Sequence, residues 1–158
     1  MKFKKGDMWE SFPESDLFLV TGNSVVKKDG TLVMGRGIAK EAKERYPQFP
    51  LAAGQYLSRH QEYRKNKPYG LLLNVYKMCP KLGVFQVKAH YKDKASIELI
   101  RYSTMLLSIY IKKYENMINT VNLNFPGIGY GGLDRKEVLP ILEEFLSDSA
   151  QKVTIWEK

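Results

Sequence analysis

The strongest constraint on the fold is a strand, a glycine-bearing loop and a helix that follow one another between Leu17 and Tyr46. The apolar run from Leu17 to Val20 predicts a buried strand, which Gly22-Asn23 ends. A polar loop then leads to Met34-Gly35-Arg36-Gly37, where we expect a helix to begin. The first N–H groups of a helix lack acceptors inside it, and glycines let an anion approach the backbone. The stretch therefore indicates a site for a phosphate-bearing ligand; the alternative is that the glycines serve only as turns.

Strands and helices alternate along the rest of the chain, which predicts an α/β fold layered around a largely parallel or mixed sheet. We expect strands at residues 3–9, 16–22, 69–76, 84–88, 118–125 and 152–156, and helices at residues 37–45, 50–58, 95–113 and 134–146. A second glycine loop, PGIGYGGL at 126–133, also follows a strand. Ligands of such sheets bind beyond the carboxyl ends of the strands. Both glycine loops are therefore expected to reach one ligand, and two phosphate-binding loops suit a diphosphate.

The formal net charge of +8 favours association with polyanions and anionic ligands. Much of the excess lies at residues 59–67 and 88–94, where Tyr63 and Tyr91 are interleaved with basic residues. This composition suits contact with phosphates and stacking on bases. Neither run is a recognised nucleic-acid-binding module, so a solvated basic surface is the alternative.

Length and composition disfavour several classes of protein. A chain of 158 residues is typical of one domain, here 1–158, and a monomer is its simplest state. No apolar run approaches the roughly 20 residues that cross a bilayer, and no signal peptide follows the basic start. The single cysteine, Cys79, cannot form an internal disulfide, which agrees with a cytoplasmic location. Because no apolar run is long enough to span a bilayer, no membrane partner is predicted. Two histidines and one cysteine make a zinc site unexpected, so no metal is predicted either.

Four features together resemble a macro domain, the ADP-ribose-binding α/β/α module. They are Gly6-Asp7 after the first strand, Asn23 in a loop that ends in MGRGIA, Lys88 at a strand end, and PGIGYGGLDR at 126–135. The nearest look-alikes remove terminal ADP-ribose from protein carboxylates or, as antitoxins, reverse ADP-ribosylation of DNA. The resemblance covers nearly the whole chain and implies a three-layer α/β/α fold with a central mixed sheet.

The resemblance also implies a set of ligand-binding residues. Asp7 matches the aspartate that binds the adenine amino group, with a turn aspartate as the alternative. Asn23 matches the asparagine that hydrogen-bonds the distal ribose, although VTGNS departs from the usual VNAAN and the amide can equally satisfy backbone groups. Tyr130 would cover the distal ribose or a phosphate, or only cap the core. The two diphosphate loops correspond to Gly35, Arg36, Gly37 and Ile38, and to Gly127, Ile128, Gly129, Tyr130, Gly131 and Gly132.

Two further residues match positions that carry catalysis in the hydrolase branches. Lys88 matches a lysine nucleophile for the anomeric carbon of the distal ribose, which requires its unprotonated form. Asp134 matches an acidic residue that would carry the proton to and from the leaving group. Each has a simpler interpretation: Lys88 as an exposed strand-end lysine, and Asp134 with Glu137 as a helix capping box. His90 is a secondary candidate.

The resemblance thus implies an ADP-ribosyl hydrolase that needs no cofactor and no metal. Its partner would be ADP-ribose or an ADP-ribosylated macromolecule, either a protein or a nucleic acid. Two alternatives stay open: a reader that binds ADP-ribose without turning it over, and a phosphatase acting on ADP-ribose 1''-phosphate. A NAD-dependent oxidoreductase is disfavoured because the glycines do not form GxGxxG.

Overall fold

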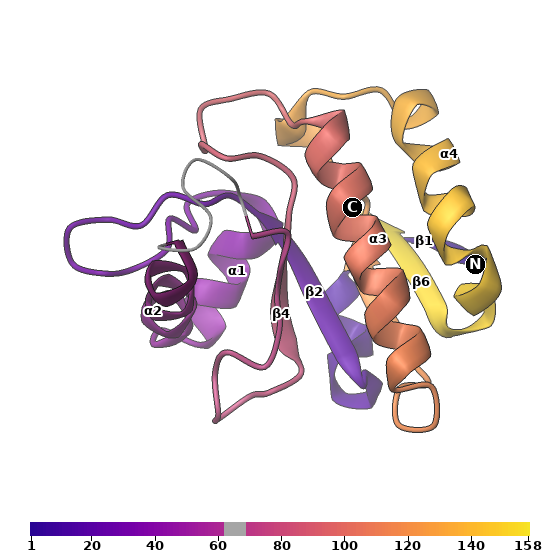
Figure 1. Cartoon of the computed structure of the whole chain (residues 1–158), viewed down its shortest axis with the longest axis horizontal. Coiled ribbons are helices and arrows are strands. Elements are labelled where there is room, and N and C mark those ends of the chain that lie inside the picture. The colour runs from indigo at the N-terminus through magenta and orange to yellow at the C-terminus, as the bar shows by residue number, and fades with distance from the viewer. Residues whose placement is uncertain (62–68) are drawn as a thin grey trace.

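A computed structural model of the chain describes residues 1–61 and 69–158. Its sheet is six-stranded, in the order β1-β6-β5-β2-β4-β3. Figure 1 labels four of these strands, β1, β6, β2 and β4. Neighbouring strands are parallel except β3, which runs antiparallel to β4, so the sheet is mixed. The strands are β1 (Lys2–Lys5), β2 (Leu17–Gly22), β3 (Leu71–Leu72), β4 (Leu82–Gln86), β5 (Val121–Asn124) and β6 (Val153–Glu157).

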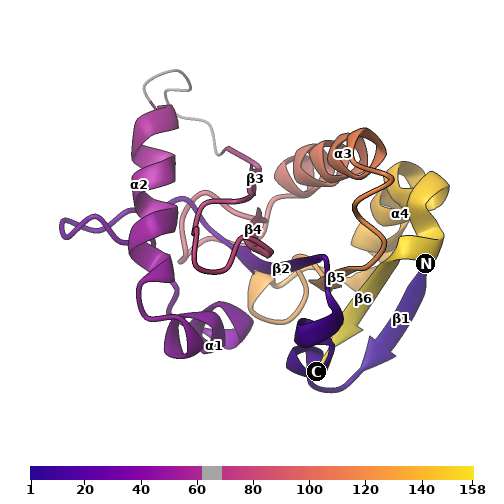
Figure 2. The same cartoon turned by 90° about the horizontal axis from the view of Figure 1, so that it is seen from below.

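Helices cover both faces of this sheet (Figure 2). One face packs against α3 and α4, and the other against α1, α2 and the 3-10 helix η1. The predicted three-layer α/β/α fold with a central mixed sheet is therefore confirmed. The helices are α1 (Gly37–Arg45), α2 (Phe49–Gln61), α3 (Ile97–Lys113) and α4 (Arg135–Leu146), with 3-10 helices η1 (Met8–Glu14), η2 (Gly129–Gly131) and η3 (Ser147–Lys152).

Strand β2 is covered on both faces, as its continuous apolar sequence predicts. Leu17 and Leu19 belong to the core beneath α3 and α4. Phe18 and Val20 belong to the core beneath α1 and α2. Successive side chains of a strand point to opposite faces, so an unbroken apolar run can fill two cores at once.

The strand expected at 3–9 is wrong beyond Lys5. Gly6 has φ +136°, which turns the backbone out of the sheet. Asp7 then caps η1, because its carboxylate accepts a hydrogen bond from the N–H of Trp9 at 3.0 Å. Met8 and Trp9, which the prediction placed in the strand, are instead buried residues of η1.

The edge of the sheet near β3 also differs from expectation. Only Leu71 and Leu72 pair with β4, whereas a strand was expected over 69–76. The strand expected at 84–88 begins and ends two residues earlier, because Gly83 was interpreted as part of a turn, yet Leu82 and Gly83 lie within β4. A β-carbon on Gly83 would stand 2.7 Å from the carbonyl oxygen of Leu72, so this glycine marks a close approach between strands.

The helices follow the sequence more closely. The helix at 37–45 has its expected bounds, and α3 begins at Ile97 because the Ser96 hydroxyl caps the N–H of Leu99 at 3.2 Å. Helix α2 runs to Gln61, beyond the helix expected at 50–58, so Arg59 and His60 of the basic run are helical. The rest of that run, 62–67 with Tyr63, lies outside the described residues. Among the residues described, none of the helices has the length and apolar character needed to cross a membrane.

Asp16 ties the start of β2 to the start of β5, and this contact generates a pH-dependent prediction. Its carboxylate accepts hydrogen bonds from the N–H groups of Asn119 at 2.8 Å and Thr120 at 3.1 Å. The bond from Asn119 is the main cause that lowers the pKa of Asp16 below its usual value. A lowered pKa in the folded state stabilises the fold above the unfolded-state pKa, and this gain is lost as pH falls through the folded-state value.

We therefore expect Asp16→Ala to lower the free energy of unfolding at pH 7 by about 1 kcal/mol or less, because the group is exposed. The difference from wild type should be smaller at pH 2 than at pH 7, because the gain is lost as the pH falls through the lowered folded-state pKa of Asp16. Urea unfolding at both pH values measures it. Glu143→Ala, which removes an exposed carboxylate on α4, is the control and should match wild type at both. A difference for Asp16→Ala that does not change with pH would contradict the assignment.

Candidate functional site

A cleft of about 980 Å³ opens at the carboxyl ends of β2, β5 and β6. It contains most of the residues that the sequence singles out for a ligand site, drawn from four separate segments. These are Asp7, Asn23, Gly35, Arg36, Gly37, Ile38, Lys88, Gly127, Ile128, Gly129, Tyr130 and Gly131. Two others, Gly132 and Asp134, are not part of its lining.

The first wall of the cleft is the start of helix α1. Gly37, Ile38 and Ala39 begin this helix and line the cleft. Arg36 occupies the N-cap position without a capping hydrogen bond from its side chain, and no acidic residue lies in the first turn. The N-terminal N–H groups and the helix dipole are therefore open to an anion from the cleft. This is the chemistry that the MGRG sequence predicts.

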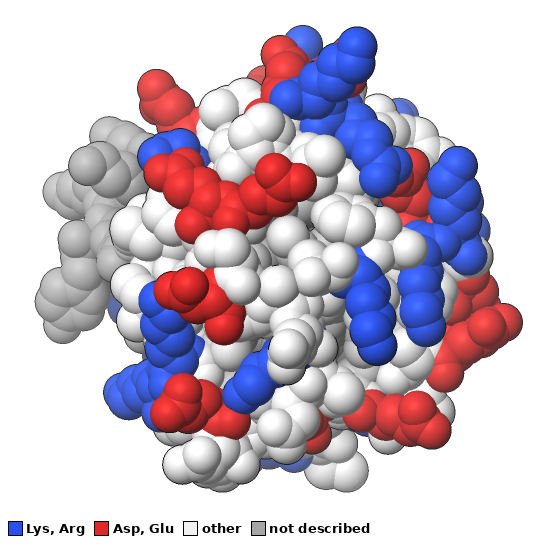
Figure 3. Space-filling view, turned by 90° about the vertical axis from the view of Figure 1, so that its right-hand side faces the viewer, with Lys and Arg blue, Asp and Glu red and all other residues white. Residues whose placement is uncertain are grey.

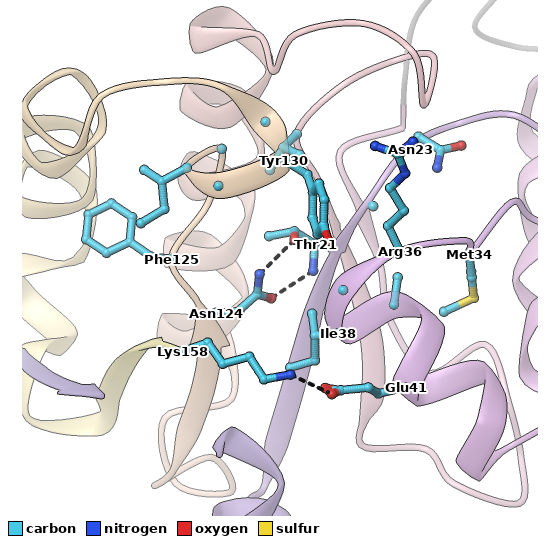
Figure 4. A pocket seen from close by; sticks show the side chains of 18 of the residues that line it. Thr21, Asn23, Met34, Arg36, Ile38, Glu41, Asn124, Phe125, Tyr130 and Lys158 are labelled. Carbon is cyan, nitrogen blue, oxygen red and sulfur yellow. Dashed lines mark hydrogen bonds and ion pairs between the residues drawn. The ribbon is translucent and has the colours of Figure 1, made fainter. Parts of the chain in front are cut away.

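The second glycine loop meets the first across the mouth of the cleft. Tyr130, in η2, is 70% exposed, and the Arg36 guanidinium lies 5.4 Å from the centre of its ring. The ring also lies over the first loop, 3.7 Å from where a β-carbon of Gly37 would stand. Figure 4 shows both side chains reaching into the same space above β2. This cation–π contact, here called the Arg36–Tyr130 bridge, joins the two loops.

A second contact joins the loops from below. Asn124, at the end of β5, accepts a hydrogen bond from the N–H of Thr21 at 2.9 Å and donates one to its hydroxyl at 2.8 Å (Figure 4). Both residues line the cleft, and neither was predicted. Their position one to three residues before the glycine loops is a signal that was available in the sequence.

Asn23 is buried at the Lys88 end of the cleft, and its amide is already engaged. The side chain donates to the carbonyl of Val33 at 3.0 Å and accepts from the N–H of Val25 at 2.8 Å. These bonds fold the first loop back on itself. One amide hydrogen and one acceptor position remain, so contact with a distal ribose stays a prediction for Asn23.

Asp7 lies at the opposite end of the cleft. One of its carboxylate oxygens caps η1, which leaves the other for a ligand. Near this end Glu41 of α1 forms an ion pair with Lys158 at 3.3 Å, and both line the cleft (Figure 4). The two residues are 117 positions apart in the sequence, and no local pattern signals their pairing.

Lys88 is half-buried, and its Nζ donates to the carbonyl of Asp93 at 3.2 Å. The intervening residues form the rim of the cleft. Tyr91 is 43% exposed and stacks on His90, with ring centres 4.3 Å apart. Tyr91, Lys92 and Asp93 line the cleft, whereas the sequence singled them out only as part of a basic run.

Asp134 caps helix α4. Its carboxylate accepts from the N–H of Lys136 at 2.9 Å, and the Glu137 carboxylate accepts from the N–H of Asp134 at 3.0 Å. This is the capping box that formed the simpler interpretation of the sequence. The side chain is exposed and lies three residues beyond Gly131, the last lining residue of the second loop. A role for Asp134 in proton transfer stays a prediction.

Charges elsewhere on the surface are mixed. On the face shown in Figure 3, acidic side chains lie among the lysines and arginines. Surface charges of the described residues also form ion pairs, such as Arg101 with Glu144 at 2.8 Å and Lys112 with Asp148 at 3.2 Å. The described part of the chain holds no group of three or more His, Cys, Asp or Glu side chains arranged for a metal ion. The cleft ligand groups are instead backbone amides and the side chains named above.

Comparison with known proteins relates this architecture to solved structures only. No protein-family model matches the chain, and no curated protein sequence matches it either. The macrodomain of Mycobacterium tuberculosis DarG superimposes with a TM-score of 0.73 at 22% identity, covering 99% of this chain and 97% of that one. The chain has the macrodomain fold.

Two further structures support this assignment. The macrodomain of Thermus aquaticus DarG gives a TM-score of 0.69 at 22% identity, over 98% of this chain and 95% of that one. Thermosipho africanus DarTG in complex with ADP-ribose gives 0.74 at 20% identity; 99% of this chain matches 41% of that longer one. In this chain, which has the macrodomain fold, the cleft lies where the two glycine loops meet.

Gly35 provides a test of the cleft as a diphosphate site. A β-carbon there would meet nothing within 4 Å, and the residue lines the cleft, so Gly35→Val should fold normally and obstruct the cavity. We expect binding of ADP, measured by isothermal titration, to weaken roughly tenfold or more, the change that displacing a diphosphate contact predicts.

The matched variant is Gly83→Val, whose side chain would collide with the Leu72 carbonyl inside the sheet. It should lower the thermal unfolding midpoint, whereas Gly35→Val should not. If Gly35→Val bound ADP as wild type does, the first glycine loop would not be a diphosphate site.

Proposed function

We propose that this chain binds ADP-ribose in the cleft and removes it, by hydrolysis, from a modified protein side chain or nucleic-acid base. The observation that carries the proposal is the meeting of two glycine loops at the carboxyl edge of one sheet. The start of α1 and the loop around η2 both line a single cleft and are joined by the Arg36–Tyr130 bridge, and Thr21 and Asn124 join the strand ends from which the glycine loops depart. Such an arrangement suits a diphosphate held by backbone amides.

The residues at the two ends of the cleft support a ligand that carries one further group on each side of the diphosphate. Asp7 offers a carboxylate oxygen at one end, which suits an adenine amino group. Lys88 and Asn23 lie at the other end, which suits a second ribose. The volume, about 980 Å³, is at the upper end of the range usual for small-molecule sites. A similar fold in a protein whose structure contains ADP-ribose adds support.

The rim next to Lys88 supports a macromolecular substrate. Tyr91 is exposed and held by stacking on His90, and Lys92 lies beside it at the cleft. An exposed aromatic ring beside lysines suits a nucleobase and its phosphates. We therefore include an ADP-ribosylated nucleic acid among the proposed substrates, together with an ADP-ribosylated protein.

The proposed reaction breaks the bond between C1'' of the distal ribose and the modified group. The uncharged amine of Lys88 attacks C1'', and the leaving group departs with the bonding electrons. The proton that Nζ loses reaches the leaving group through an acid–base carrier, the role predicted for Asp134. Water then attacks C1'', the bond from carbon to Nζ breaks, and the amine takes up the proton that water loses. The product is free ADP-ribose.

A reader that binds ADP-ribose without hydrolysis is the second candidate. The observation that favours it is the position of Asp134, whose carboxylate is held by the Lys136 N–H beside the cleft and does not line it. The two candidates differ in what Lys88 and Asp134 do, and variants of these residues separate them.

We expect Lys88→Ala to bind ADP-ribose within about threefold of wild type but to release it from substrate at least 100-fold more slowly, as for a lost catalytic group. Isothermal titration gives the affinity, and release from an ADP-ribosylated oligonucleotide and an ADP-ribosylated protein gives the rate. Lys113→Ala, an exposed lysine at the end of α3, is the control and should behave as wild type. Wild-type binding with no release from either substrate would favour the reader.

Asp134→Asn separates proton transfer from helix capping. Asparagine is as good an N-cap as aspartate, so the variant should unfold at the wild-type temperature. If Asp134 carries the proton, release of ADP-ribose should slow by about 100-fold, because the amide cannot be protonated and deprotonated in the same way. Unchanged release would leave Asp134 as the cap of α4 alone. Asp134→Ala, which loses the cap as well, should cost about 1 kcal/mol of stability.

A further inference from the structure

Gln86 is a polar side chain in the middle of the core. It is the last residue of β4, lies two positions before Lys88, and is 0% exposed between the buried apolar residues Phe85 and Val87. A buried amide destabilises a fold unless each of its polar atoms finds a partner. Its retention at this position therefore calls for a structural reason, which its contacts supply.

Both polar atoms of the Gln86 amide are hydrogen-bonded. Its Nε2 donates to the carbonyl of Asn23 at 3.0 Å and to the hydroxyl of Ser24 at 2.8 Å. Its Oε1 accepts from the N–H of Gly70 at 2.5 Å. The Ser103 hydroxyl of α3 donates to the Gln86 carbonyl at 2.8 Å. These partners are all uncharged, and they come from three segments distant in the sequence.

These bonds connect the first loop to the segment that carries Lys88. On either side of them, the N–H of Val87 donates to the carbonyl of Gly22, and the N–H of Ser24 donates to the carbonyl of Ala89, both at 2.9 Å. Gln86 thus fastens the backbone of Asn23 beside the backbone of Lys88. None of the hydrogen bonds of this amide involves Asp7 or the start of α1.

We propose that Gln86 is a positioning residue that fixes Asn23 and Lys88 relative to each other and so lets the cleft distinguish ADP-ribose from ADP. The inference rests on the proposed function, because it needs ADP-ribose to place its distal ribose at the Lys88 end. Gln86 does not touch the ligand and acts through the backbone of the residues that do.

Two variants remove the bonds in different ways. Gln86→Met keeps the length of the side chain and leaves the Asn23 carbonyl, the Ser24 hydroxyl and the Gly70 N–H without their partner. Gln86→Glu keeps the shape, but an ionised carboxylate cannot donate to the Asn23 carbonyl. When protonated it regains one donor, and burial favours this neutral form, so its defect should diminish as pH falls.

The test is isothermal titration of ADP-ribose and ADP with wild type, both Gln86 variants and the exposed Gln55→Glu of α2 as the matched control, at pH 6 and pH 8. Both Gln86 variants should bind ADP-ribose about tenfold more weakly at pH 8 and ADP as wild type does. Gln86→Glu should recover most of the loss at pH 6. Gln55→Glu should match wild type throughout. Circular dichroism checks the fold, and Ser24→Ala, which removes one bond, replaces Gln86→Met if that variant does not fold.

The outcomes distinguish the inference from the function on which it rests. If wild type binds ADP-ribose no better than ADP, the proposed use of the Lys88 end fails, and the role of Gln86 fails with it. If wild type discriminates and the variants discriminate equally well, only the role of Gln86 is overturned. An equal loss of affinity for both ligands would show a general structural role and would also overturn it.

Discussion

The parallel pairing of β2 with β5 is the constraint on which the cleft depends. Because the two strands run in the same direction, the loops that leave their carboxyl ends emerge at the same edge of the sheet. Residues about 100 positions apart thereby come together as two walls of one cavity. The pairing is secured by burial on both faces, since β2 supplies side chains to both cores. Removing this strand from the centre of the sheet would separate the glycine loops.

The two walls are then fixed by polar contacts of different kinds. Thr21 and Asn124 hold the strand ends together with two hydrogen bonds in a partly buried position. Gln86 holds the first loop to the segment that follows β4, where water is excluded and each bond is worth more. The cleft is thus rigid at its base and at its Lys88 end, which is what preorganised recognition of a flexible ligand requires.

The sequence alone predicts the layered fold because its strongest signals are local and cooperative. The apolar run at Leu17–Val20 and the glycines that follow are adjacent in the chain, so one pattern indicates both the strand and the loop. Gly83 misled the strand prediction, because a glycine that permits a close approach resembles one that forms a turn. The same limit applies to η1, where the apolar pair Met8 and Trp9 resembles the end of a strand buried on both faces.

Residues of the candidate site could be predicted from the sequence only where they belong to a recognisable sequence motif. The glycine loops and Lys88 stand in recognisable segments, and they line the cleft. Gln86 and its partner Asn23 are 63 positions apart, and the pair of Glu41 with Lys158 is separated further still. No periodicity or spacing encodes such contacts, since they arise only when the sheet brings the segments together. Asp134 shows the opposite limit, because the same residues satisfy both a capping motif and a catalytic one.

The Arg36–Tyr130 bridge has a consequence for how a bulky substrate enters. An exposed cation–π contact contributes only about 0.5–1 kcal/mol, which is close to thermal energy. The Arg36–Tyr130 contact therefore breaks and re-forms readily, and the two glycine loops can separate. An ADP-ribose group that is attached to a macromolecule has no free distal end, so it could not pass lengthwise beneath a permanently closed Arg36–Tyr130 bridge. Under the proposed function, the weak Arg36–Tyr130 bridge would let the whole group enter the cleft from the side, with its attachment left outside.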